Sequence, residues 1–459
     1  MNFSTCFSTC LPLLIGGLLP AIVSAAVPAT PFFPSLDPFY TPKEGSWEGL
    51  DPGTIIDHRQ VHINSLRYGI QSTSMAYQLL YVTKDLNDKP AHSVTTIVVP
   101  KNAKKDRLLS VQPAYDSPDI NCSPSYGIQV GAVGPSLSWN MMDLSFVQPF
   151  IREDGPVLNI PDYEGWNAAF TVGPQTAYHT LDSIRAAFNF KDKIGLQPNA
   201  RTVMYGFSGG AYATEWASEM QPSYAPELHQ IKGAAMGGPP PNITNTYIYC
   251  DGGDWAELNV WAVLGMMNAV PEMKEYIDND LLEEHRDEFY GPLRRCSRHF
   301  GVEDVPPSLA HRNISSFFKH GDHFLYKFRE TLDHLGVMGR RGAPKFPMYI
   351  YQGTKDEIVD PIEVTNQLVR DLCEKDADVR YHQYPCTNHM NTLIKGAGSV
   401  WLWIARVLEG LATIPGCLEK DLNPPISGSD DGCPKDGEEA LLMDDDVLKF
   451  QIPMRDELR

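Results

Sequence analysis

The sequence predicts an α/β fold in which helices flank a mainly parallel β-sheet and a further helical segment is inserted late in the chain. Segments typical of strands alternate with segments typical of helices, which is the pattern of βαβ units and parallel sheets. A glycine-rich turn at residues 206–210 joins one such strand to one such helix. The stretch 221–340 breaks the alternation and contains mainly helical patterns. These three observations fix the expected fold class.

Length and composition suit either one large globular domain or a domain with a substantial insertion. The chain has 459 residues, of which 42% are hydrophobic and 21% are charged, and its formal net charge is −19. A surface this acidic disfavours nucleic acid or an anionic membrane as the main partner. We therefore expect no nucleic-acid partner.

The two ends of the chain predict segments outside the folded core. Residues 1–26 hold an apolar run followed by small residues, as a secretory signal peptide does, although no Lys or Arg precedes the run. Residues 419–459 are rich in Asp and Glu, which predicts an acidic, partly disordered tail. The core is then expected over 27–220 and 341–418, with 221–340 as a helical cap.

The composition also predicts a secreted, extracellular protein. Sequons for N-glycosylation stand at Asn121, Asn242 and Asn313. Seven cysteines remain after the predicted signal is removed, and an oxidising compartment favours two or three disulfides with one odd thiol. No cysteine or histidine spacing is typical of zinc, so we expect no metal.

The first half of the core is expected to supply four strands and a helix. Strands are predicted at 75–83, 93–100, 108–112 and 157–160, where β-branched and apolar residues concentrate or alternate with polar ones. Apolar residues recur at helical spacing over 175–189, which predicts a helix there.

The next segment carries the most informative motif of the chain. Residues 201–205 predict a short buried strand and 211–220 a helix, and Gly206-Phe207-Ser208-Gly209-Gly210 stands between them. This is the G-x-S-x-G nucleophile elbow of the α/β-hydrolase fold, in which a strained turn exposes a serine hydroxyl. Ser208 is the candidate nucleophile, and the N–H of Gly209 at a helix N-terminus can stabilise negative charge. The alternative is a Gly-Ser turn that matches by chance.

The late elements complete the expected sheet. Strands are predicted at 346–351 and 379–384, a helix at 363–374 between them, and a closing helix at 400–411. Within the insertion, the apolar helical run 255–267 is either one wall of an acyl pocket or an ordinary buried helix.

A serine nucleophile needs a general base, and the base needs an acid to orient it, in the chain order Ser, Asp/Glu, His. Asp356 follows a predicted strand in a loop, where this fold places its acid, and is preferred over its neighbours Glu357 and Asp360. His389 follows the last predicted strand in a loop and is preferred as the base over His382, which lies inside that strand.

Two further groups of residues are weaker candidates. His311, His320 and His323 lack a third ligand at a recognised spacing, so we expect them on a solvated surface. A second oxyanion donor is expected from the loop 113–117 after an early strand, but the sequence pattern alone does not select one.

Several blocks together resemble the fungal secretory lipase family, the lipase-A-like α/β-hydrolases. The matching blocks are 32–40, 115–126, 160–165, 181–186, 206–211, 223–228 and 356–359. Three features depart from the family pattern: Phe207 stands where Tyr is usual, Trp166-Asn167 differs, and the cap over 251–340 is poorly matched.

The resemblance implies hydrolysis of carboxylic esters, from triacylglycerols to acetyl esters of secondary metabolites, without a cofactor. It places the triad on Ser208, Asp356 and His389. It places the oxyanion donors on the backbone N–H groups of Asp116 and Gly209.

The resemblance also implies two disulfides, Cys122–Cys296 and Cys373–Cys417. It leaves Cys250, Cys386 and Cys433 unassigned, with Cys386–Cys433 as one option. Each disulfide is expected to stabilise the fold by about 2–4 kcal/mol, because it restricts the unfolded chain.

We therefore predict a secreted serine carboxylic-ester hydrolase that acts through a Ser-His-Asp triad and an acyl-enzyme. The expected substrate is an acylglycerol or another lipophilic ester, with at most transient contact with a lipid interface, and the expected state is a monomer. A short-chain esterase that deacetylates a secondary metabolite is one alternative, and a serine peptidase is another. A catalytically silent binding protein on a hydrolase scaffold is the alternative of a different class, although the intact set of catalytic residue types argues against it.

Overall fold

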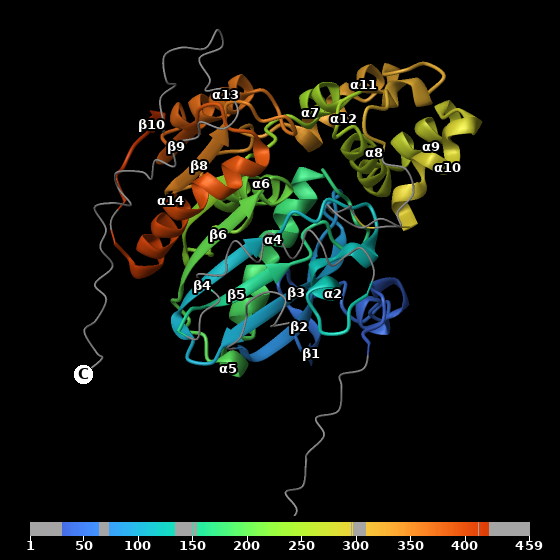
Figure 1. Ribbon diagram of the computed structural model, residues 1–459. Coiled ribbons are helices and arrows are strands. Elements are labelled where there is room, and N and C mark those ends of the chain that lie inside the picture. The colour runs from blue at the N-terminus through green and yellow to red at the C-terminus, as the bar shows by residue number, and fades with distance from the viewer. Residues whose placement is uncertain are drawn as a thin grey trace, which may run out of the picture.

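Ten strands form one sheet in the computed structural model, in the order β1-β2-β3-β5-β4-β6-β7-β8-β9-β10 (Figure 1). The structure describes residues 30–63, 73–133, 150, 154–294, 296, 309–411 and 413–421. The predicted signal peptide lies outside the described residues, as does the predicted acidic tail beyond residue 421.

The sheet is antiparallel at one end and parallel over the rest. Strands β1, β2 and β3 pair antiparallel with their neighbours, and each adjacent pair from β5 to β10 is parallel. The bounds are β1 (Ile55–Gln60), β2 (Thr73–Lys84), β3 (Pro90–Pro100), β4 (Lys104–Gln112), β5 (Pro156–Pro161), β6 (Arg201–Phe207), β7 (Ile231–Gly237), β8 (Met348–Gly353), β9 (Val379–Tyr384) and β10 (Leu418–Asp421). The predicted α/β-hydrolase fold with a mainly parallel sheet is confirmed.

Three strands, β1, β7 and β10, escaped prediction from the sequence. Strand β7 consists mainly of Gly, Ala and Met, so it lacks the β-branched residues by which strands are recognised. It nevertheless pairs with β6 and β8 in the middle of the sheet, where α6 and α14 pack against it. The predicted cap boundary at residue 221 is therefore wrong, because α6 continues to Tyr224 and β7 belongs to the sheet.

Helices cover both faces of the sheet. The main helices of the core are α4 (Gly173–Asn189), α6 (Gly209–Tyr224), α13 (Ile362–Cys373) and α14 (His389–Glu409), with short α2 (Pro124–Gly127), α5 (Lys191–Ile194) and the 3-10 turns η1 (Pro34–Leu36), η2 (Pro38–Tyr40) and η3 (Ile120–Cys122). Helices α4 and α6 pack on each other and share one apolar core, whereas α14 packs on β6, β7 and β8 over a second core. On α4 the buried residues Ala177, Leu181, Ile184 and Phe188 recur at three- and four-residue spacing, which gives the helix one apolar face.

The segment between β7 and β8 folds into a group of helices, seen at the upper right of Figure 1. These are α7 (Ile243–Cys250), α8 (Glu257–Ala269), α9 (Pro271–Asp280), η6 (Glu283–His285), α10 (Arg286–Phe289), η7 (Gly291–Arg294), η8 (Ile314–Phe317), α11 (His323–Lys327) and α12 (Arg329–Gly336). Among the described residues, every helix is too short or too polar to cross a lipid bilayer.

Both disulfides implied by the family resemblance are present. Cys122 is bonded to Cys296, across 174 residues of sequence, and Cys373 is bonded to Cys417. Cys250 is a free, buried thiol. Cys386 is also disulfide-bonded, and because residue 433 lies outside the described residues, the pairing Cys386–Cys433 stays a prediction.

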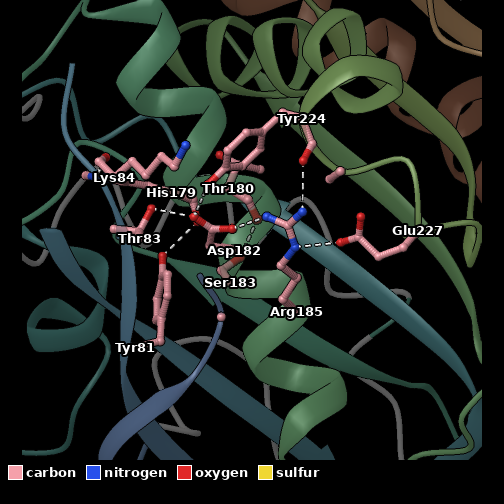
Figure 2. A network of polar contacts seen from close by, with 12 residues as sticks. Tyr81, Thr83, Lys84, His179, Thr180, Asp182, Ser183, Arg185, Tyr224 and Glu227 are labelled. Atoms are coloured by element: carbon pink, nitrogen blue, oxygen red, sulfur yellow. Dashed lines mark hydrogen bonds and ion pairs between the residues drawn. The ribbon is translucent and has the colours of Figure 1, made fainter. Parts of the chain in front are cut away.

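A buried ionic network joins α4 to the end of α6 (Figure 2). The Asp182 carboxylate accepts hydrogen bonds from Thr83 Oγ1 at 2.6 Å and Tyr224 Oη at 2.8 Å, and Arg185 lies 2.5 Å away. Arg185 also pairs with Glu227 at 2.7 Å and donates to the Tyr224 carbonyl at 2.9 Å. Burial raises the pKa of Asp182 to about 6 in spite of the nearby guanidinium. The network therefore holds a carboxylate that is costly to bury without its cation.

We predict that Arg185→Ala lowers the free energy of unfolding by about 3 kcal/mol at pH 8, because it leaves the Asp182 carboxylate buried and unpaired. The loss should shrink near pH 5, since removing the cation raises the Asp182 pKa further and a protonated carboxyl needs no partner. Urea unfolding at both pH values measures the difference. Arg340→Ala is the control, because Arg340 is 54% exposed beside Asp333 and its loss should cost less than about 1 kcal/mol. An Arg185→Ala penalty independent of pH would contradict this account.

Candidate active site

Ser208 occupies a sharp turn between the end of β6 and the start of α6. Its backbone has φ 55° and ψ −121°, a conformation that costs free energy for any residue other than glycine. The chain segments around it approach very closely. A Cβ at Gly206 would lie 2.0 Å from the Gly210 carbonyl oxygen, and one at Gly210 would lie 1.9 Å from the Gln112 carbonyl oxygen. The glycines of the motif are therefore required by close backbone packing, and the turn has the geometry of a nucleophile elbow.

Asp356 and His389 are joined by a buried hydrogen bond. Asp356 Oδ2 lies 2.7 Å from His389 Nδ1, and both side chains are almost fully buried. The second oxygen, Asp356 Oδ1, accepts the backbone N–H groups of Ile358 and Val359 at 3.1 Å each. The carboxylate is thus fixed on one side by the backbone and orients the imidazole on the other. Among the described residues, the opposite ring nitrogen, His389 Nε2, has no hydrogen-bond partner.

The pKa of His389 lies above its ordinary value of 6.5. Burial alone would lower this pKa, but the Asp356 carboxylate raises it, with smaller contributions from Glu357 and Asp116. An imidazolium formed during a reaction would therefore be stabilised at this position.

Two contacts of His389 and one hydrogen bond of Ser208 show that the histidine lies beside the elbow. Its ring packs on Phe207, the residue before Ser208, with ring centroids 4.7 Å apart. The Ser208 N–H donates to the Gly237 carbonyl at 2.9 Å. The next residue, Gly238, lies against the imidazole so closely that a Cβ there would be 2.7 Å from His389 Cε1. The histidine, the acid and the elbow serine thus share one region at the carboxyl ends of β6, β7 and β8.

The position of His389 differs from the predicted loop. His389 is the first residue of α14, which starts eleven residues before the predicted helix at 400. Asn388 caps this helix by accepting the Asn391 N–H, and Glu357 accepts the His389 N–H at 2.9 Å. Neither the contact of Glu357 with the His389 N–H nor that of Phe207 with the imidazole was predicted. The only signal in the sequence for Glu357 was its place directly after Asp356, and the only signal for Phe207 was its place directly before Ser208.

Asp116, the second oxyanion donor that the resemblance implies, lies against the N-terminus of α6. It follows β4 with φ 40°, and its carboxyl is buried. A Cβ built on Gly209 would lie 1.8 Å from Asp116 Oδ1, so the two residues are in direct contact. Burial raises the pKa of Asp116 to about 7, against a smaller opposing effect of His389. The pKa of the nearby Glu164 carboxyl is also raised, by burial first and by Asp116 second.

A small cavity opens beside these groups. Its volume is 50 Å³, and Ser208, Gly209 and Asp116 form part of its lining. Helices α7 and α8 supply much of the remaining wall, including Leu258 and Ala262 of α8. The apolar run 255–267 fits both interpretations, because Leu258 and Ala262 line the cavity while Val260 and Leu264 belong to the main buried core. Its role as a wall of an acyl pocket stays a prediction.

Helix α7 is fastened to the loop that carries Asp356. Tyr249 Oη donates to the Asp356 carbonyl at 3.1 Å, and Cys250 Sγ donates to the Ile358 carbonyl at 2.9 Å. At the other end of α7, the Asn242 N–H donates to Asp360 Oδ2 at 2.8 Å. Asp360 is thus a structural acid at the base of α7 and does not orient the histidine.

The remaining candidates lie elsewhere. His382 is buried in β9, where Tyr349 and Arg380 hold its two ring nitrogens. The side chains of His311 and His320 are 71% and 69% exposed and pair with single carboxylates, as expected for a solvated surface. Nowhere in the described ranges do three or more His, Cys, Asp or Glu side chains cluster so as to hold a metal ion.

The side-chain oxygens of the three sequon asparagines accept hydrogen bonds from backbone N–H groups. Asn242 caps α7, Asn313 caps η8, and Asn121 accepts the Ser35 N–H. Glycosylation of the three stays a prediction.

Comparison with known proteins gives a consistent answer. A family model described as secretory lipase matches residues 136–416. The trichothecene C-3 esterase of Fusarium sporotrichioides is 32% identical over 421 residues, which cover 88% of this chain and 91% of that protein. Lipase A of Arthroderma benhamiae is 32% identical over 409 residues, which cover 87% of this chain and 84% of that protein.

A comparison with solved structures points to the same family as the comparison of sequences. The crystal structure of Candida antarctica lipase A superposes with a TM-score of 0.75 at 26% identity, over 86% of this chain and 90% of that one. The family match extends over more than half of the chain, and the sheet order and elbow described above are those of a hydrolase. The chain belongs to the secretory lipase family and is a carboxylic-ester hydrolase.

Proposed function

We propose that the protein hydrolyses lipophilic carboxylic esters through a covalent acyl-enzyme on Ser208, with His389 as general base and Asp356 as its orienting acid. The observation that carries the proposal is the buried 2.7 Å hydrogen bond between Asp356 and His389, beside a strained serine turn. His389 Nε2, which has no hydrogen-bond partner in the part of the chain that the structure describes, is the nitrogen that would take the serine proton.

In this mechanism the Ser208 oxygen attacks the ester carbonyl carbon while its proton passes to His389 Nε2. Asp356 stabilises the imidazolium and holds the ring in the required tautomer. The imidazolium then protonates the departing alcohol, which leaves an acyl-serine. Water, deprotonated by the same imidazole, attacks this ester, and collapse of the second tetrahedral intermediate frees the acid and the serine.

Backbone N–H groups of Gly209 and Asp116 are the proposed oxyanion donors. Gly209 is the first residue of α6, so its N–H has no partner within the helix and lies at the positive end of the helix dipole. Asp116 lies in contact with it across the turn. Donors fixed in this way stabilise developing charge without reorganisation during the reaction.

The names of relatives support the substrate class only broadly. Relatives include secreted triacylglycerol lipases of Malassezia as well as the trichothecene esterase. We propose a lipophilic ester as the substrate and the extracellular space as the location, with residues 1–26 as signal peptide. The segment between β7 and β8 is proposed as the cap and the residues after 421 as an acidic tail.

Ser208→Ala is expected to reduce kcat roughly 10⁶-fold and to abolish labelling by a fluorophosphonate probe, because no other group can form the acyl-enzyme. Hydrolysis of p-nitrophenyl esters and gel fluorescence measure the two effects. The exposed Ser223 serves as control, and Ser223→Ala should leave both unchanged. Hydrolysis of these esters by Ser208→Ala at the rate of the parent protein would overturn the mechanism. An unlabelled wild type would instead favour a silent binding protein, and cleavage of fluorogenic peptides would favour a peptidase.

Asp356→Asn is expected to lower kcat by roughly 10⁴-fold, since the amide favours the wrong imidazole tautomer. The rate should rise with pH as His389 loses its proton, with a midpoint above 6.5 in the parent and a lower midpoint in the variant, which lacks the charge that raises the pKa. The pH dependence of kcat/KM gives the midpoint of each protein. Glu357→Gln keeps a hydrogen-bond acceptor for the His389 N–H and should lose less than about tenfold. Equal losses in the two variants would contradict the assignment of the acid.

Gly209→Ala is expected to reduce kcat by about 10²- to 10³-fold, because the new methyl group would displace Asp116 and with it an oxyanion donor. Adding Asp116→Gly removes the clashing carboxyl, keeps the backbone N–H and should recover much of the rate. Gly398→Ala on α14 is the matched control, since a Cβ there meets nothing within 4 Å. Steady-state kinetics of the four proteins tests the prediction, and full activity of Gly209→Ala would refute it.

A further inference from the structure

We propose that the acyl site beside Ser208 is built for short acyl groups, from acetyl to butyryl, and rejects long fatty acyl chains. This inference rests on the proposed function, because it assigns the cavity at the elbow to the acyl group of the ester. Four features carry it: the volume of the cavity, the fixation of its aromatic walls, the close approach of α8, and the charge of its lining.

The volume of the cavity is the first feature. The described residues around Ser208 leave a volume of 50 Å³ in a cavity that is partly open to the surface. A dry protein cavity of about 150 Å³ holds one benzene molecule, so a third of that volume suits about two carbon-sized groups. The methyl to propyl portion of an acetyl to butyryl ester falls in this range, and an octanoyl chain exceeds it.

Tyr212 closes one wall and is held in place at its tip. Its hydroxyl lies 2.9 Å from the Thr171 carbonyl and 2.6 Å from the Leu335 carbonyl. Its ring is buried and packs near Trp216, with centroids 6.0 Å apart. A substrate chain could pass this side chain only by breaking a buried hydrogen bond.

Tyr247 fixes a second wall at the junction of α7 and α8. Its ring packs edge-on against Phe324, with centroids 5.5 Å apart. Its carbonyl accepts a hydrogen bond from Asn259 Nδ2 at 2.8 Å, which ties α7 to α8. The two helices that line the cavity are therefore joined to each other as well as to the core.

Helix α8 also lies directly on the loop at Phe170. A Cβ at Gly265 would be 2.5 Å from the Phe170 carbonyl oxygen, so no space separates the helix from the loop. Leu258 and Ala262 of α8 project into the same apolar cluster as Phe170. On the side of α8 the cavity therefore ends against packed side chains.

The lining selects a neutral acyl group. Among the described residues, those that line the cavity include no Lys, Arg or His, and Asp116 is the one acidic side chain. The other lining side chains are mainly apolar, among them Ile243, Leu258 and Ile358. An acyl chain that carries a carboxylate would find no counter-charge here, so dicarboxylic half-esters are expected to be poor substrates.

The test is an acyl-length series on the full-length protein, with p-nitrophenyl acetate, butyrate, octanoate and palmitate below their critical micelle concentrations. We expect kcat/KM to be highest for acetate or butyrate and to fall about tenfold or more at octanoate, since overpacked methylene groups in a fixed pocket are costly. Equal or higher kcat/KM for octanoate or palmitate would overturn the proposal.

Two variants alter the volume in opposite directions. Leu258→Ala should raise the octanoate-to-acetate ratio of kcat/KM about tenfold, because it lengthens the cavity. Ala262→Phe should lower kcat/KM for butyrate more than for acetate, because it fills the cavity. Leu325→Ala on α11 is the matched control outside the cavity, and its ratio should equal that of the parent. Thermal unfolding confirms that each variant is folded, and an unchanged ratio in both folded cavity variants would also overturn the proposal.

Failure of this inference is distinguishable from failure of the proposed function. If Ser208 labels with a fluorophosphonate and long-chain esters are preferred, the hydrolase mechanism stands and the short-acyl assignment falls. If no ester in the series is hydrolysed in a Ser208-dependent manner, the proposed function falls and takes the assignment with it.

Discussion

The hydrogen bond between Asp356 and His389 is the interaction on which the rest of the site depends. It joins a loop after β8 to the first turn of α14, and both partners are removed from water, where such a bond is electrostatically stronger. Two backbone N–H groups fix the far oxygen of the carboxylate, so its direction is set by the loop. The parallel strands place that loop and the Ser208 turn at the same edge of the sheet. A change in either loop would therefore misdirect the imidazole.

The helices between β7 and β8 are structurally coupled to the candidate catalytic loop. Helix α7 lines the cavity and contacts the same loop through Asn242, Tyr249 and Cys250. Any shift of α7 would be transmitted to the backbone of Asp356. Burial raises the pKa of Asp360, the carboxyl that anchors this contact, to about 7. The wall of the cavity and the orientation of the Asp356–His389 pair are thus parts of one packed unit.

The accuracy of the sequence predictions followed the strength of the local signals. Strands rich in β-branched or aromatic residues, such as β3 and β8, and amphipathic α4 were predicted close to their observed bounds. Strand β7 was missed because its small residues carry no strand preference, and only its neighbours on both sides hold it in the sheet. Helix α14 starts before its predicted position because the capping residue Asn388 and the contacts of His389 determine its first turn.

The sequence alone determined the elbow motif and, through family resemblance, two of the disulfides, and it predicted the order of the candidate nucleophile, acid and base. These depend on residue type, on short spacings or on a shared ancestry, all of which are visible along the chain. Only the tertiary structure decided that Asp116 lies against Gly209, that His389 begins a helix beside Phe207, and that the cavity at Ser208 is small. Those properties arise from distances between segments far apart in sequence. Packing sets these distances to a few tenths of an ångström, and no local pattern encodes them.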